Sequence, residues 1–197
     1  MRRFGPILIV TVTILTAGAK AQAHDPPLFA VFKAVCVDTD ASPDAVRSAV
    51  EAVGGKQRVP LGTTAQPFPM TVTTWDLTAG GQSMYVSAGT QQVPPIQGRP
   101  QEESNRCIVN SFVNDDASVE AIREWIGVPP ANILRGNPTM YFFNYQELGS
   151  VRSTLPRAKI AYDKAKAEGR IWSLMVSQSQ DGASVQLVHH LAPPIPR

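Results

Sequence analysis

Apolar positions recur with helical spacing in two segments of the chain. Between Asp44 and Val53, four apolar residues follow the i, i+3, i+4, i+7 pattern that lines one face of a helix: Val46, Ala49, Val50 and Val53. Pro43 suits the first helical position, and Gly54 with Gly55 ends the pattern. We therefore predict a helix here, with its apolar face in the core.

The second helical pattern follows a strand-like run. Cys107 to Val113 is predicted as a strand, and Asn114 to Asp116 supplies residue types that cap helices. The helix face after this cap consists of Val119, Ile122 and Ile126, and Gly127 closes it. A similar strand is predicted before the first helix, because the run from Leu28 to Val37 is mostly apolar and β-compatible.

Each strand and helix is followed by a predicted hairpin. The first runs from Met70 to Ser87 around Ala79-Gly80-Gly81. The second runs from Ile171 to Leu191 around Asp181-Gly182, and Asp-Gly is a strong hairpin signal. Both hairpins predict neighbouring antiparallel strands.

Together these elements predict an α+β fold, with a mainly antiparallel sheet and helices packed on one face. The order is that of two βαββ-like halves, with Met140 to Tyr145 and a helix from about Pro156 to Glu168 inserted into the second half. The alternative is that strand, cap, helix and glycine recur because α+β domains commonly use them. Both interpretations give the same fold class.

Two connections and a tail show little periodicity. The connections are Arg58 to Pro69 and Gln92 to Pro100, and the proline-rich tail covers Pro193 to Arg197. Irregular segments of about a dozen residues are often binding or lid loops, but they can equally be surface connections. Both interpretations of the two loops stay open.

Residues 1–23 have the three parts of a secretory signal peptide: positive Arg2-Arg3, apolar Ile7 to Leu15, and the small-residue cleavage site Ala21-Gln22-Ala23. At about 1.5 Å per residue, the apolar run covers roughly half of a bilayer core of about 30 Å. We expect cleavage, a single domain over 24–197, and a periplasmic or extracellular protein without a stable membrane anchor. An uncleaved signal anchor is the alternative, and the export route stays open.

Charge narrows the possible partners. Three of the 18 basic residues lie in the signal segment, whereas all 16 acidic residues follow it, so the mature chain is nearly neutral. An overall attraction to nucleic acid therefore has no support. We expect no nucleic-acid partner.

One segment keeps a local positive bias. Between 152 and 170 the cations are Arg152, Arg157, Lys159, Lys164, Lys166 and Arg170. Such a surface could bind an anionic envelope component, for example a lipid headgroup or an acidic polysaccharide. The alternative is an ordinary solvated helix face, because Lys159 with Asp163 and Lys164 with Glu168 have the i, i+4 spacing of intrahelical ion pairs.

Cys36 and Cys107 are the only cysteines, and export would bring them to a compartment where disulfides persist. We predict a structural disulfide that closes a loop of roughly 70 residues, which the chain-entropy model values at about 4 kcal/mol. The alternative is two buried free thiols on separate strands. A redox pair is not expected, because the Cys-x-x-Cys spacing is missing.

Processing would give His24 a free α-amine beside its imidazole, a pair that can chelate Cu(II). No firm metal site follows from this, and we expect no cofactor. His189 and His190 should point to opposite faces of their strand, so only one of them can reach any one site. A structural role is favoured for His189.

Trp75, Trp125 and Trp172 could stack against sugars, but core positions are favoured for them. The usual hydrolase, zinc, phosphate-loop and Ser-x-x-Lys motifs are missing from the sequence. We therefore expect an exported soluble protein that acts as a non-enzymatic binding or envelope-associated module, with an anionic envelope component or a protein as partner. The alternative is a small exported hydrolase whose active site assembles from distant positions.

Overall fold

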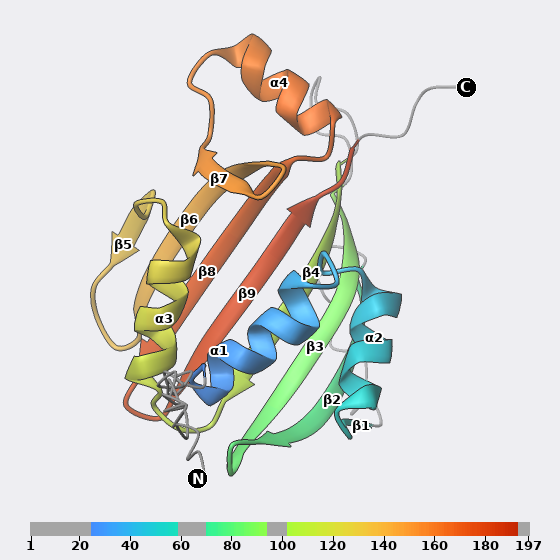
Figure 1. Ribbon diagram of the computed structural model, residues 1–197, viewed down its shortest axis with the longest axis vertical. Helices are drawn as coiled ribbons and strands as arrows, with labels where there is room; N and C mark the ends of the chain where they lie inside the picture. The colour runs from blue at the N-terminus through green and yellow to red at the C-terminus, as the bar shows by residue number, and fades with distance from the viewer. Residues whose placement is uncertain (1–24, 59–69, 94–101, 193–197) are drawn as a thin grey trace, which may run out of the picture.

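The computed structural model describes residues 25–58, 70–93 and 102–192 (Figure 1). The predicted signal segment, His24, most of the two predicted loops and the proline-rich tail lie outside the described residues. The helices are α1 (Pro27–Phe32), the π-helix η1 (Lys33–Val37), α2 (Pro43–Ala52), α3 (Asp116–Ile126) and α4 (Lys159–Ala167). The strands are β1 (Lys56–Gln57), β2 (Met70–Ala79), β3 (Gln82–Val93), β4 (Glu102–Ser111), β5 (Asn132–Leu134), β6 (Thr139–Leu148), β7 (Val151–Thr154), β8 (Ile171–Ser179) and β9 (Gly182–His190).

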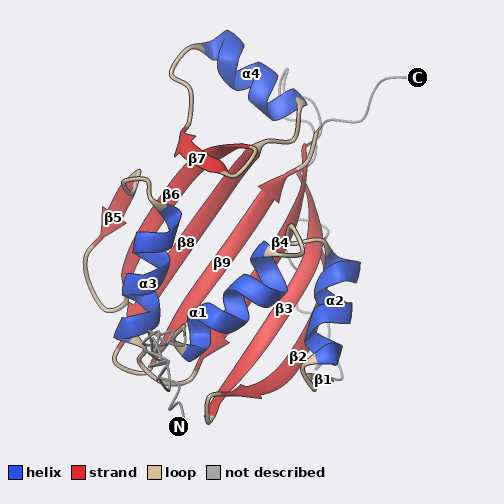
Figure 2. Ribbon diagram, viewed as in Figure 1, coloured by secondary structure: helices blue, strands red, loops and turns tan. Residues whose placement is uncertain are grey.

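These nine strands form one antiparallel sheet. The strand order is β1-β2-β3-β4-β9-β8-β6-β5, and β7 also pairs with β6. Helices α1, α2 and α3 lie on one face of the sheet, whereas α4 stands beyond one end of it (Figures 1 and 2). The predicted α+β class, a mainly antiparallel sheet with helices packed on one face, is confirmed.

The segment from Leu28 to Val37 is helical, so the strand predicted there is wrong. It forms α1 and η1, and its buried residues recur with helical spacing: Leu28, Phe29, Val31, Phe32, Val35 and Cys36. Ala34 on the other side is exposed. An unbroken apolar run fits a buried helix as well as a strand, and Pro27 in the first turn favours the helix.

The strand order is symmetric about the central pair β4 and β9. From one edge toward the centre the strands are ordered β2, β3, β4, and from the other edge they are ordered β6, β8, β9. Helix α2 precedes the first three strands and α3 precedes the second three. Each half therefore has its helix before its strands, and neither half has the predicted βαββ order. Cys36 and Cys107 do not occupy equivalent positions, because Cys36 lies in η1 and Cys107 in β4.

The predicted cap and turns are in place. Asp115 is the N-cap of α3, and its carboxylate accepts hydrogen bonds from the backbone N (3.0 Å) and Oγ (2.7 Å) of Ser118. The same Oγ accepts a hydrogen bond from Phe29 N at 3.1 Å, so this cap also holds the start of α1. Gly127 ends α3 at a φ of 65°, in the left-handed region that favours glycine.

The hydrophobic core lies between the sheet and helices α1 to α3. Its largest fully buried side chains include Trp75, Tyr145, Phe32, Phe143, Leu28, Met84 and Ile122. In the central pair, Val109 of β4 is directly opposite Val185 of β9, and both are fully buried. The core therefore continues without a break from one half to the other.

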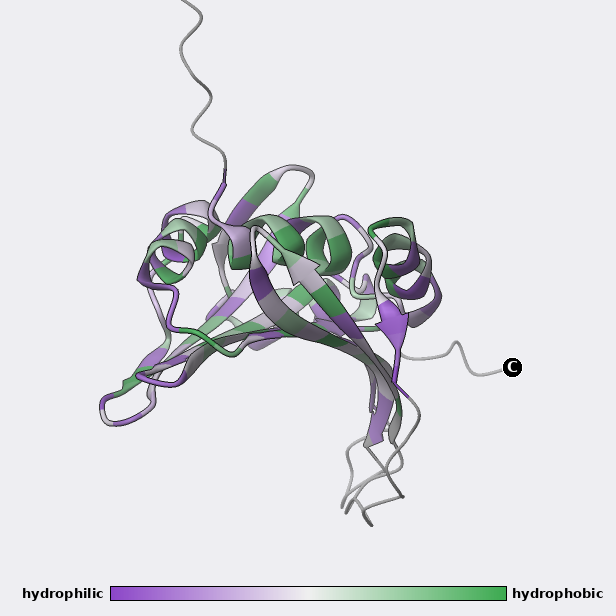
Figure 3. Ribbon diagram, turned by 90° about the horizontal axis from the view of Figure 1, so that it is seen from below, coloured by the Kyte–Doolittle hydropathy of each residue, from purple (hydrophilic) through white to green (hydrophobic). Residues whose placement is uncertain are grey.

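Alternation along the strands gives the sheet a helix-covered face and a helix-free face. In β4, Cys107 and Val109 point toward the helices, whereas Arg106 and Ile108 point to the helix-free side. Figure 3 shows that the sheet is curved and that its edges bend away from the helix layer. The helix-free face therefore lies on the inner side of the curve.

Candidate binding site on the helix-free face of the sheet

A polar cluster lies on the helix-free face where β4, β9 and β8 run side by side. Arg106 of β4 is directly opposite Val188 of β9, which is in turn opposite Ser173 of β8. His190 is on the same face, two residues after Val188, and is therefore diagonal to Arg106 and Ser173 at roughly 7–8 Å. The register brings a guanidinium, an imidazole and a hydroxyl around one buried apolar residue, because Val188 is buried.

Two small residues leave room in this cluster. Gly89 of β3 is directly opposite Arg106 and places no side chain beside the guanidinium. Ser104 is directly opposite His190, and it is buried. Glycine within a strand is typical of places where a ligand or another backbone comes close. The cluster therefore has polar side chains on β4, β8 and β9, with the free donor on Arg106 of β4, and little bulk on the β3 side.

Hydrogen bonds fix the proton on His190. Ser173 Oγ donates to Asn144 Oδ1 of β6 at 2.9 Å, which uses the only hydroxyl proton. His190 Nε2 lies 3.0 Å from the same Oγ, so in this arrangement Nε2 carries the proton and donates it to Ser173. The imidazole and the amide therefore hold the hydroxyl from both sides.

Burial lowers the pKa of His190, so the imidazole is neutral at neutral pH. The charge of Glu102 opposes this shift, whereas the charges of Lys166, His189 and Arg106 add to it. Lys166 of α4 pairs with Glu102 at the start of β4, which brings the end of α4 close to the cluster. His190 is thus a neutral hydrogen-bonding group beside two cations and one carboxylate.

Arg106 is the most unusual member of the cluster. Its Nε is buried and has no hydrogen-bond partner among the described residues, and none of the described carboxylates forms an ion pair with it. Burial lowers the pKa of Arg106, but a guanidinium still keeps its charge at any physiological pH. A half-buried cation without a counter-charge is the arrangement that an anionic ligand completes.

The six cations predicted as an anion-binding surface are spread over β7, α4 and the turns beside them. Four of them have carboxylate partners: Arg152 with Glu147, Lys159 with Asp163, Lys166 with Glu102, and Arg170 with Glu168. Arg157 and Lys164 have none among the described residues. Arg152 also stacks on Trp125, with its Cζ 3.8 Å from the ring centroid. Of this set, only Lys166 contributes charge to the cluster around His190.

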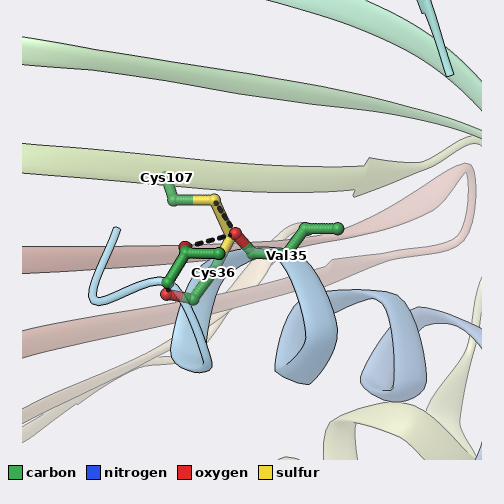
Figure 4. The surroundings of a disulfide bond; sticks show 4 residues. Val35, Cys36 and Cys107 are labelled. Atoms are coloured by element: carbon green, nitrogen blue, oxygen red, sulfur yellow. Dashed lines mark hydrogen bonds between the residues drawn. A yellow bond between two sulfur atoms is a disulfide. The ribbon is translucent and has the colours of Figure 1, made fainter. Parts of the chain in front are cut away.

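The predicted disulfide joins Cys36 of η1 to Cys107 of β4, with the two Cα atoms 5.4 Å apart (Figure 4). Both residues are fully buried. Cys107 Sγ also lies 3.7 Å from the Val35 carbonyl oxygen. This contact is not a hydrogen bond, because a disulfide sulfur carries no proton. The bridge lies on the helix-covered face, behind the strand that carries Arg106.

His189 and His190 point to opposite faces, as alternation predicted. His189 stacks on Trp172 with ring centroids 3.9 Å apart, and its Nε2 lies 2.7 Å from the carbonyl oxygen of Gly169. Trp75 and Trp172 are core residues, whereas Trp125 is half-buried against Phe29 and Phe32. His189 thus has a structural environment, and His190 belongs to the candidate site.

Sequence reasoning missed Arg106 and Ser173. The signal for Arg106 was its position directly before the apolar residues Cys107, Ile108 and Val109, at the start of the predicted strand. Ser173 had no comparable signal. In the described part of the chain, no group of three or more His, Cys, Asp or Glu side chains is arranged to hold a metal ion. His24 lies outside that part.

Helices long and apolar enough to cross a membrane are not found among residues 25–58, 70–93 and 102–192. Comparison of the chain with protein-family models, with curated proteins and with solved structures finds no match.

Proposed function

We propose that the protein is an exported, non-enzymatic binding module that holds an anionic group of an envelope component on the helix-free face of its sheet. The observation that carries this proposal is Arg106, a half-buried guanidinium with no described carboxylate partner. The signal-like residues 1–23 and the Cys36–Cys107 disulfide support export to the periplasm or beyond.

The cluster has the groups that a carboxylate or phosphate needs. A guanidinium can donate two parallel hydrogen bonds to such an anion, and this geometry is stronger and more selective than a single contact. Lys166 adds positive charge, although Glu102 partly neutralises it. Because His190 is neutral, it adds no third charge, and its Nε2 proton orients Ser173 rather than the ligand.

The alternative, a small exported hydrolase, draws on the contact between Ser173 and His190. Nucleophilic catalysis would need Ser173 to give its proton to the imidazole. Here Ser173 donates to Asn144. The N–H groups of β8 also pair in the sheet, because β8 lies between β6 and β9, and none is left to stabilise an oxyanion. The geometry therefore favours binding.

The test is calorimetric titration of the oxidised mature protein with an acidic polysaccharide, with anionic phospholipid vesicles and with inorganic phosphate. We expect saturable binding to one of these probes and a loss of about ten- to a hundredfold in affinity for Arg106→Gln. Arg47→Gln is the matched control, since it removes the same charge from the exposed side of α2, and its affinity should not change.

Equal affinities for the two variants, or no binding to any of the three probes, would contradict the proposal. The hydrolase alternative is tested separately with chromogenic esters. Turnover that disappears in Ser173→Ala would replace the binding module with the enzyme.

A further inference from the structure

A depression lies on the opposite side of the sheet from Arg106. It has a volume of about 400 Å³ and lies between the start of α3, the start of β6 and the end of β8. Tyr141 of β6 and Gln178 of β8 are in register with Val176 and Ala183, which are core residues under the helices. The pocket is therefore separate from the candidate anion site.

Side-chain amides dominate the lining of this pocket. The residues that matter are Asn114, Asn137, Gln178, Gln180, Asp116 and Tyr141. The described residues that line it include no lysine and no arginine. Each amide offers a donor and an acceptor on one flat group, and a sugar hydroxyl is likewise both donor and acceptor. A strongly anionic ligand is disfavoured by Asp116, and one carboxylate among many amides gives little selectivity for a cation.

Several of these side chains are held in place. Gln178 Nε2 donates to Asn114 Oδ1 at 3.4 Å and also to the Asp116 carboxylate, so β8 and the start of α3 are joined across the pocket. Thr139 Oγ donates to the Gly136 carbonyl oxygen at 3.0 Å, which ties the loop before β6. A site whose polar groups are already ordered loses less entropy when a ligand binds.

Tyr141 supplies the apolar part of the site. The Arg123 guanidinium packs over its ring, with Cζ 4.8 Å from the centroid, and fixes the plane of the ring. An aromatic side chain with a polar hydroxyl can pack against the C–H face of a sugar while its oxygen hydrogen-bonds. The volume falls in the range of roughly 300–1,000 Å³ typical of small-molecule sites.

We infer that this pocket binds a neutral polyhydroxylated ligand, a mono- or disaccharide, through Gln178, Asn114 and Tyr141. This inference is independent of the proposed anion site, because no lining residue of the pocket belongs to the Arg106 cluster. Either site can fail its test without affecting the other.

The test is NMR titration of the ¹⁵N-labelled, oxidised mature protein with a panel of neutral hexoses and their disaccharides. We expect saturable shifts of the side-chain amide signals of Gln178 and Asn114 for at least one sugar. Gln178→Leu should lower the affinity for that sugar by about tenfold. Asn114→Leu is the second variant, since Asn114 is exposed and its replacement should leave the fold intact.

The matched control is Gln57→Leu, which removes an exposed amide from β1 at the other edge of the sheet and should leave the affinity unchanged. The inference is overturned if no neutral sugar gives a saturable shift. It is also overturned if the Asn114 and Gln178 variants bind the sugar as tightly as the control does.

Discussion

His190 links the candidate anion site to the stability of the fold. Burial lowers its pKa below the ordinary value of 6.5, so the unfolded chain takes up a proton at a higher pH than the folded protein does. The free energy of unfolding therefore decreases as the pH falls through 6.5, and this contribution levels off below the folded pKa of His190.

Urea unfolding of the wild type and of His190→Gln, from about pH 7.5 to about pH 5.5, tests this pH dependence. The glutamine amide reaches the position of Nε2 and can still donate to Ser173, but it does not titrate. The difference in unfolding free energy between the two proteins should shrink as the pH falls, because only the wild type loses stability through this histidine. A difference that stays constant over the whole range would contradict the proposed environment of His190.

At the scale of single residues, the sequence correctly predicted the features that depend only on neighbouring residues in the chain. Asp115 as a cap, Gly127 as a helix end, and the opposite directions of His189 and His190 all follow from neighbours in the chain. Arg106 could not be identified in this way. Alternation shows that it lies opposite to Cys107, but only the pairing of β4 with β3 and β9 places it beside Gly89 and His190.

At the scale of elements, the disulfide joins a helix to the sheet. Cys36 and Cys107 are 71 residues apart, and the bridge closes a loop that includes α2, β2 and β3. Restricting such a loop in the unfolded chain stabilises the folded protein by about 4 kcal/mol in the chain-entropy model. Reduction should therefore lower the free energy of unfolding by about this amount, as measured by urea unfolding with and without reductant.

A double variant, Cys36→Ala with Cys107→Ala, is the control for this experiment. It has no bridge, so its unfolding midpoint should not respond to reductant. If the wild type were equally insensitive, the bridge would contribute nothing to stability, and the close packing of η1 on β4 would have to rest on apolar contacts alone.

Most elements were predictable because their patterns are unambiguous. The α2 and α3 patterns repeat every three to four positions, and the β8–β9 hairpin turns at Asp181-Gly182. The segment from Leu28 to Val37 was not predictable, because nearly all of its residues are apolar and such a run has no distinguishable period. Its helical form is decided by tertiary packing, in which α1 touches both α3 and β4.

At the scale of the whole molecule, the symmetric strand order makes one core out of two halves. The contact between them is the β4–β9 ladder. Its opposite pairs Val109 with Val185 and Cys107 with Leu187 are fully buried. Either half alone would leave this apolar strip in contact with water. The sheet of one half alone would also expose the edge of β4 or β9 without a partner, and such edges favour association. The two halves should therefore unfold together.

Two tryptophans on opposite sides of the central ladder allow a direct test. Trp75 lies in β2 and Trp172 in β8, and both are buried. In one variant only Trp75 is kept, and in the other only Trp172, with phenylalanine replacing the remaining tryptophans. Each variant is unfolded in urea and followed by fluorescence and by far-ultraviolet circular dichroism.

Within each variant the two signals should have the same midpoint, because a two-state transition gives coincident curves with every probe. The midpoints of the two variants can differ, since each loses different core contacts, without affecting this comparison. A fluorescence midpoint for Trp75 that separates from the circular dichroism midpoint would mean that the β2–β4 side unfolds independently. The core across β4 and β9 would then not couple the halves, and the Arg106 cluster would lie at a boundary between two separately unfolding units.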